Sequence, residues 1–438
     1  MARSGWSRRK AVPFAAASTV FAAFAAMWLG GLRHIYMSLL TGIGVPAFRF
    51  PFLDTQAVLA AIQCRRAGIN VYLIDPCDAL GRIHVYSPLW LRADVLPVTT
   101  QWTPWVGLGL VALFLASLAL LPQAPGRFGG LLMATASVSP PVLFAMERGN
   151  IDLLMFAFAA TRPWRWNPTC RAIGYLLTLL AAALKYYPVV VLVLALRERP
   201  FKAAAVLLGS AALLGTAVLL DLHEVLHALR LVPQPSFFAP GFGARDLPYG
   251  LAVLFGWPPA AAAGLLLALV LAMVSGGWLL ARGLRPSLAA LPDDSAAFLL
   301  VGAALIVGCF LTAQSIQYRD ILMLFLLPGL VSLSNAGGRA GKLFGYTLGV
   351  LMAILWLMTV WWISPSLRAV LWALKEAGWW WLATMCSAVV WNAVQTSPLV
   401  RICWHATGHL WHPGSRPAAV RYKAIPAAIA PRDGVPHR

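Results

Sequence analysis

The stretch AAAVLLGSAALLGTAVLL, residues 203–220, decides the fold class of this chain. It carries no charged side chain, and Lys202 and Asp221 stand at its two ends. A helix of about 20 apolar residues is long enough to cross the roughly 30 Å hydrocarbon layer of a membrane. The stretch therefore predicts a membrane-spanning helix.

The composition of the whole chain supports the same interpretation. Of its 438 residues, 60% are hydrophobic and 11% are charged, whereas about a quarter of the residues in a soluble domain are charged. A soluble protein also needs a polar surface, which this composition does not supply. Segments with strand-like alternation are absent, and in lipid a helix satisfies its own backbone. We therefore expect an all-α integral membrane protein.

Further apolar stretches recur along the chain, and we expect a bundle of about twelve membrane-spanning helices within residues 1–396. Several of these stretches are shorter than a full crossing, which is typical of helices that line a cavity. The first stretch is too long for a signal peptide, so we expect it to be retained. The predicted spans are residues 11–32, 104–121, 128–145, 151–160, 172–184, 185–196, 203–220, 258–281, 296–313, 320–334, 343–363 and 378–396.

The distribution of charge predicts the orientation of the chain. Its formal net charge is +19, and the basic residues lie mainly in short connections and at both ends. Basic connections stay on the cytoplasmic side of a membrane, although contact with phospholipid or phosphate explains some such residues. We expect both termini in the cytoplasm, long outer segments at residues 33–103 and 221–257, and a mobile basic tail at residues 397–438.

The six cysteines form no CxxC motif and no cluster with histidine, so we expect no metal site. Cys64 and Cys77 lie in the same outer segment, where oxidation is possible. The loop between them is short enough to be closed without unusual geometry. We predict that these two cysteines form a disulfide.

The first outer segment holds several polar candidates. Asp54 begins an amphipathic stretch that continues to Ile62, which is typical of a helix on the membrane surface. Its carboxylate either caps that helix or accepts a proton from a substrate hydroxyl. Asp75, Asp78 and His84 follow in NVYLIDPCDALGRIHVYSPLWL, where they either pack within the loop or contact a substrate.

A second polar run, MERGNID at residues 146–152, joins two short apolar stretches. Glu147 and Arg148 either neutralise each other or contact a ligand, and Asn150 suits a helix cap. Asp152 lies inside the following apolar stretch, which capping does not explain. Ionisable residues are costly inside a membrane, so this run predicts a functional site.

Two further runs carry cations between apolar stretches. Lys185 stands in ALKYYP, residues 183–188, where it either extends to the interface or meets an anion such as a phosphate. Tyr318 and Arg319 lie in QSIQYRD, residues 314–320. Arg319 either pairs with Asp320 or binds a phosphate through its planar guanidinium.

Together, the runs ERGNIDLLMFAF and ALKYYPVVVL and the early acidic position resemble glycosyltransferase family 87, a member of the GT-C class of membrane transferases. The resemblance implies a GT-C-like bundle and a polyprenyl-phosphate-linked sugar donor, often a mannose donor. It implies inverting transfer on the outer face, with an acidic base in the first outer loop. By motif position that base is Asp54. Asp75 and Asp78 remain alternatives, because the paired acidic motif frequent in the class is not seen at Asp54.

We therefore expect a multi-pass enzyme of the plasma (inner) membrane that transfers a sugar to a lipid or glycan acceptor, without nucleic acid as a partner. The leaving phosphate needs cations, and Lys and Arg can supply them without a metal cofactor. The competing interpretation is a transporter or flippase that uses the same charges without a base. A purely structural subunit is disfavoured by Asp152 and Lys185. The expected substrate contacts are Glu147, Arg148, Asn150, Asp152, Lys185, Tyr318, Arg319 and His84.

Overall fold

The fold was examined in a computed structural model that describes residues 11–48, 50–161, 168–232, 235–312, 314–363 and 365–411. Within these residues the chain is helical, except for loops and two short strands, β1 (Gly241–Phe242) and β2 (Ser315–Ile316). The two strands pair antiparallel, with Gly241 opposite Ile316. The expected all-α architecture is therefore confirmed.

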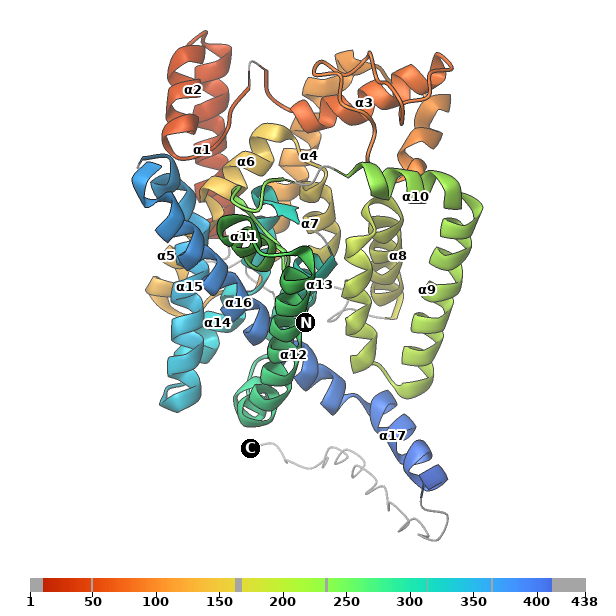
Figure 1. The fold of residues 1–438 in the computed structure, drawn as a ribbon, viewed down its shortest axis with the longest axis vertical. Helices are drawn as coiled ribbons and strands as arrows, with labels where there is room; N and C mark the ends of the chain where they lie inside the picture. The colour runs from red at the N-terminus through yellow and green to blue at the C-terminus, as the bar shows by residue number, and fades with distance from the viewer. Residues whose placement is uncertain are drawn as a thin grey trace, which may run out of the picture.

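The first half of the chain contributes ten α-helices and three 3-10 helices to the described structure (Figure 1). The α-helices are α1 (Val12–Leu29), α2 (Arg33–Gly42), α3 (Leu53–Arg66), α4 (Thr103–Leu118), α5 (Gly126–Ser137), α6 (Pro140–Arg148), α7 (Asp152–Ala160), α8 (Pro168–Lys185), α9 (Pro200–Leu220) and α10 (Leu222–Leu231). The 3-10 helices are η2 (Pro88–Val95), η3 (Thr100–Trp102) and η4 (Tyr187–Arg197).

The second half contains the longest helices, which run through the centre and lower left of the view in Figure 1. The α-helices are α11 (Asp246–Phe255), α12 (Pro259–Ala289), α13 (Asp293–Thr312), α14 (Leu327–Ser334), α15 (Gly338–Ile363), α16 (Arg368–Thr396) and α17 (Pro398–Trp411). The 3-10 helices are η5 (Gln317–Phe325) and η6 (Pro365–Leu367). Helix α17 occupies the start of the segment that we expected to be a mobile tail, and residues 412–438 lie outside the described structure.

Six helices of the described chain are long and apolar enough to cross a membrane, and α5 with α6, bent by 43°, makes a possible seventh span. The predicted number of about twelve stays a prediction. Two of the predicted spans take other forms. Residues 185–196 correspond mainly to η4, where Pro188 removes a backbone donor at the first turn, and residues 320–334 divide into η5 and α14.

Apolar side chains pack around α13 and η5 at the centre of the bundle. Phe325 on η5 stacks on Phe156 of α7 with ring centroids 4.2 Å apart. Phe298 of α13 lies against the Phe325 ring. By contrast, α1, α9 and α12 expose most of their apolar residues. Such outward-facing apolar helices suit contact with lipid, because lipid replaces water as their solvent.

Helix α3 lies at one end of the molecule, at the top of Figure 1, and is joined to the α6–α7 turn. The Phe52 N–H donates to the Glu147 carbonyl over 2.7 Å, and the Thr55 hydroxyl donates to the Gly149 carbonyl over 2.6 Å. Gly149 has a φ of +54°, and a Cβ there would lie 2.5 Å from Thr55 Oγ1. Glycine is required at this turn both by its backbone angle and by the close approach of α3.

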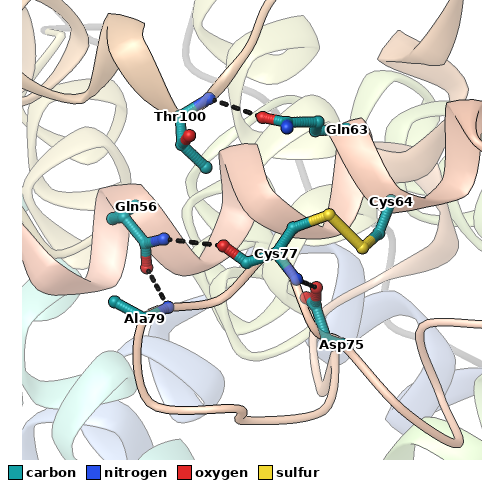
Figure 2. Close-up of a disulfide and its surroundings, with 7 residues drawn as sticks. All are labelled: Gln56, Gln63, Cys64, Asp75, Cys77, Ala79 and Thr100. Atoms are coloured by element: carbon teal, nitrogen blue, oxygen red, sulfur yellow. Dashed lines mark hydrogen bonds between the residues drawn. A yellow bond between two sulfur atoms is a disulfide. The ribbon is translucent and has the colours of Figure 1, made fainter.

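The loop after α3 is fastened by a disulfide between Cys64 and Cys77, whose Cα atoms lie 5.9 Å apart (Figure 2). Gln56 holds the same loop, since its amide donates to the Cys77 carbonyl over 3.1 Å and accepts from the Ala79 N–H over 3.4 Å. The predicted disulfide is confirmed. Asp75 lies beside the two sulfur atoms, but sulfurs bonded to each other are not thiolate ligands for a metal.

Candidate functional site

Asp152, at the first turn of α7, is the centre of a buried charged cluster. Its Oδ1 lies 2.8 Å from Lys185 Nζ and accepts a hydrogen bond from the Tyr187 hydroxyl over 2.7 Å. Its Oδ2 lies 3.4 Å from Arg319 Nε. Lys185 ends α8, Tyr187 begins η4 and Arg319 belongs to η5, so four elements meet at this carboxylate. Two cations share one anion here, which leaves an excess of positive charge in the group.

Asn150 connects this group to α3. Its Nδ2 donates to Asp54 Oδ2 over 2.7 Å, and its Oδ1 accepts from Lys185 Nζ over 3.3 Å. The same Oδ1 accepts from the N–H of Asp152, the first residue of α7, over 2.8 Å, although the N-cap position itself is Ile151. One side chain therefore links α3, the start of α7 and Lys185.

Asp54 lies in the first turn of α3 and does not cap it, because the helix begins after Phe52. Its Oδ1 lies 3.2 Å from Arg82 Nη1 and 3.9 Å from Arg148 Nη1. The side chain of Asp54 is 12% exposed, so it is reachable from outside the cluster. Phe52 adopts a φ of +65°, which is costly for a residue with a side chain and is common at functional sites.

Arg82 is a member of the cluster that the sequence analysis missed. It donates to the Leu53 carbonyl over 2.8 Å and to Asp78 Oδ1 over 2.9 Å, in addition to its contact with Asp54. The sequence offered no signal that singles it out, because five other arginines lie in the same predicted outer segment. Asp78 also accepts from the backbone of Leu80 and of Arg82 itself. It therefore shapes this loop and holds Arg82 in place.

Asp75 and His84 have no hydrogen bond or ion pair to the cluster in the described chain. Asp75 Oδ1 accepts from the Cys77 N–H over 3.2 Å, and burial raises the pKa of this carboxyl above its ordinary value. His84 is buried beside Tyr72 and Tyr86, and this burial lowers its pKa to about 4. His84 is therefore a neutral packing residue at physiological pH and lies behind Tyr86.

Aromatic rings cover the cations of the cluster. Lys185 Nζ lies 5.3 Å from the ring centroid of Tyr86 and 5.7 Å from that of Tyr318. The Arg148 guanidinium lies 4.0 Å from the ring of Phe48. These are cation–π distances, at which a ring partly replaces the water that burial removes. Tyr318, an expected substrate contact, thus lies directly against the cluster.

The alternative pair of Arg319 with Asp320 is not formed in the described chain. Arg319 faces Asp152, and its Nη1 donates to Ser315 Oγ over 2.9 Å. A separate polar group lies on α16, where Lys375 Nζ is 3.0 Å from Glu376 and donates to the Gly241 carbonyl over 3.0 Å. That second group attaches β1 to α16.

Glu147 lines a cavity of about 600 Å³ beside the cluster. Its Oε2 lies 3.6 Å from Arg148 Nε. Neither carboxylate oxygen has a hydrogen-bond partner within the described part of the chain, although the residue is only 6% exposed. Buried carboxylate oxygens without a hydrogen bond are costly, which makes this side of the site a candidate for ligand contact.

The chain was compared with known protein families, with curated proteins and with solved structures, and none of them matches. Fold and site therefore define its class by themselves. It is an α-helical protein with several helices able to span a membrane. A charged cluster lies where α3, the α6–α7 turn, the end of α8 and η5 meet.

Proposed function

We propose that this protein is a membrane glycosyltransferase of the GT-C type, related to glycosyltransferase family 87. It transfers a mannose-like sugar from a polyprenyl-phosphate donor to an acceptor hydroxyl on the outer face of the membrane. The observation that carries the proposal is the convergence of Asp54, Asn150, Asp152, Lys185 and Arg319 in one connected network. These residues come from distant segments, and each was a candidate for this chemistry by its residue type.

The reaction needs a base and a group that receives negative charge. As the acceptor oxygen attacks the anomeric carbon, its proton passes to the Asp54 carboxylate and the bond to the phosphate oxygen breaks. A positioned carboxylate accelerates such a step by about 100-fold or more. The phosphate leaves as a monoester and gains charge, which cations in a water-poor site stabilise. Attack from the side opposite the phosphate inverts the anomeric centre.

Lys185 and Arg319 are the cations available for the phosphate. Their common partner Asp152 is fully buried, and it keeps the two cations close together in the empty protein. The Arg319 side chain is 19% exposed, so an anion can approach it from the open side. Arg82 and Arg148 flank Asp54 instead, and they orient its carboxylate.

The disulfide supports an outer location for this end of the molecule, because disulfides persist in oxidising compartments. The site then faces outside while both termini stay in the cytoplasm of a multi-pass protein in the plasma (inner) membrane. Polyprenyl-linked donors carry their reactive carbon near the headgroup plane, and α3 at the end of the bundle is suited to that height.

The test uses purified protein with radiolabelled polyprenyl-phosphate mannose and total membrane lipid as the acceptor source. We expect label to move to a new product in detergent, where no gradient exists. A transporter or flippase would leave the donor intact and would move it across proteoliposomes instead. Translocation of intact donor with no new product would overturn the proposal.

A further inference from the structure

The cavity beside the cluster is bounded by α1, α2, α3, α4 and α6 and lies on the α3 side of the molecule. Its volume of about 600 Å³ is in the range of sites for small molecules. Most of its lining is apolar, including Phe24, Trp28 and Leu143. Because α1 and α4 expose much of their apolar surface, the cavity adjoins a face of the bundle that suits lipid.

A minority of the lining side chains are polar. They are Tyr36, Gln56, Thr100, Gln101, Thr103 and Glu147. The two oxygens of Glu147 lack a hydrogen-bond partner in the described chain. A buried carboxylate in this state is stabilised by a ligand that brings a donor, and a hydroxyl group supplies one.

The lining of this cavity differs in charge from the place proposed for the phosphate. Lys185 and Arg319 engage Asp152 and do not line the cavity, and none of the described lining residues is a lysine, arginine or histidine. A phosphate in the cavity would therefore find no cation among the described lining side chains to replace the water that it loses. The cavity therefore favours an uncharged head group over the phosphate of the donor.

Phe52 connects the cavity to the base. Its ring forms part of the cavity wall, and Asp54 follows two residues later on α3. The ring packs closely against Gly107 of α4 and Gly149 of the α6–α7 turn, where an added Cβ would collide with it. This packing fixes Phe52, which lines the cavity and stands two residues before Asp54.

We propose that this cavity binds the acceptor, and that the acceptor is a lipid with an uncharged, hydroxyl-bearing head group. Its apolar chain lies among the side chains of α1, α2 and α4, and a head-group hydroxyl donates to Glu147. Another hydroxyl then reaches Asp54 past Phe52. The role of the bound lipid as the acceptor rests on the proposed function. Binding of the lipid can be measured without sugar transfer.

The experiment measures photo-crosslinking in nanodiscs. One probe is a dialkylglycerol monoglucoside with a diazirine in its chain, and the other is a diazirine-bearing prenyl phosphate at the same mole fraction. Peptide mapping by mass spectrometry reports which residues are labelled. We expect the glucoside to label cavity residues such as Phe24 and Leu143, and unlabelled glucoside lipid to compete for that labelling.

Two variants test the contacts. Glu147→Leu removes both side-chain oxygens and should lower labelling by the glucoside about fivefold, the loss expected of one hydrogen bond. Ala25→Trp fills the cavity from α1, whereas Ala23→Trp adds the same side chain on the exposed face of α1 and is the matched control. Labelling should fall in Ala25→Trp and not in Ala23→Trp.

Several outcomes would overturn the inference. Preferential labelling of the cavity by the prenyl phosphate would identify it as the place of the donor chain. Equal labelling by both probes, unaffected by Glu147→Leu and without competition, would identify a lipid-filled crevice without selectivity. If Ala25→Trp fails to fold, competition by unlabelled glucoside lipid in the unaltered protein still shows whether the cavity binds the glucoside selectively. Selective glucoside binding without any sugar transfer would refute the proposed function while leaving the binding site intact.

Discussion

The Asp54 carboxylate accepts hydrogen bonds from Asn150 and Arg82 and remains partly exposed. Each of these contacts orients the side chain without closing off its open side. A base needs this combination of fixed geometry and access to the acceptor proton. The role of the residue can therefore be tested by a change that keeps its shape.

Asp54→Asn is expected to lower transfer by about 100-fold or more, because an amide does not accept the acceptor proton. Folding and donor binding should be little changed, since the substituted side chain retains an oxygen for Asn150 or Arg82. Turnover with purified protein and thermal unfolding measure the two effects. The matched control is Asp75→Asn, in the same loop, which keeps the acceptor for the Cys77 N–H. Loss of turnover in the control but not in Asp54→Asn would move the base to Asp75.

Lys185→Met is expected to weaken donor binding, because it removes a cation proposed to contact the phosphate. Asp152 keeps Arg319 as a partner, so stability should fall by less than the about 3–5 kcal/mol that a fully broken buried ion pair costs. The matched variant Lys185→Arg keeps a cation of a different shape and should restore donor affinity only in part. Thermal unfolding checks that both variants are folded. Donor affinity in folded Lys185→Met equal to that of the unaltered protein would show that Lys185 has only a structural role.

At the scale of elements, the contact between α3 and the α6–α7 turn brings Asp54 to Asn150. Gly149→Ala should weaken this contact, because a Cβ there would lie 2.5 Å from Thr55 Oγ1. The left-handed backbone at this position adds about 1–2 kcal/mol to the free-energy cost of placing alanine there. We expect a loss of stability and of transfer, measured by thermal unfolding and turnover.

Gly256→Ala is the control for this change. Gly256 ends α11 with a φ of +67°, and an added Cβ meets nothing within 4 Å. The Gly256→Ala substitution therefore has the free-energy cost of a left-handed backbone without a steric collision. The rate of sugar transfer should stay near that of the unaltered protein. Equal effects of the two substitutions would show that close approach at Gly149 is unimportant.

At the scale of the whole molecule, α3 and α17 lie at opposite ends of the bundle (Figure 1). The positive-inside rule puts the α3 end outside. In intact cells, an impermeant maleimide should label Val95→Cys, an exposed position in the first outer segment, and should spare the exposed Cys403. Permeabilised cells serve as the control and should show labelling of both. Labelling of Cys403 alone in intact cells would reverse the orientation.

The amino-acid sequence was enough to predict the helical class, the position of several spans, the pairing of Cys64 with Cys77 and most candidate residues of the site. These features are local, because an apolar run or a charged residue within it is visible without knowing its neighbours in space. A polar side chain inside an apolar stretch is costly wherever the chain folds. Asp152 and Lys185 could be recognised for that reason.

Which of these residues meet became known from the three-dimensional fold. It joined Asp54 to Asn150, gave Asp152 two cations and brought Arg82 into the cluster. It also placed His84 against the ring of Tyr86, where His84 is a packing residue. Such contacts join positions far apart in the chain, and their formation depends on how helices pack and where loops turn. Hydrophobic periodicity carries no information about that packing, because it reports only the face that each helix buries.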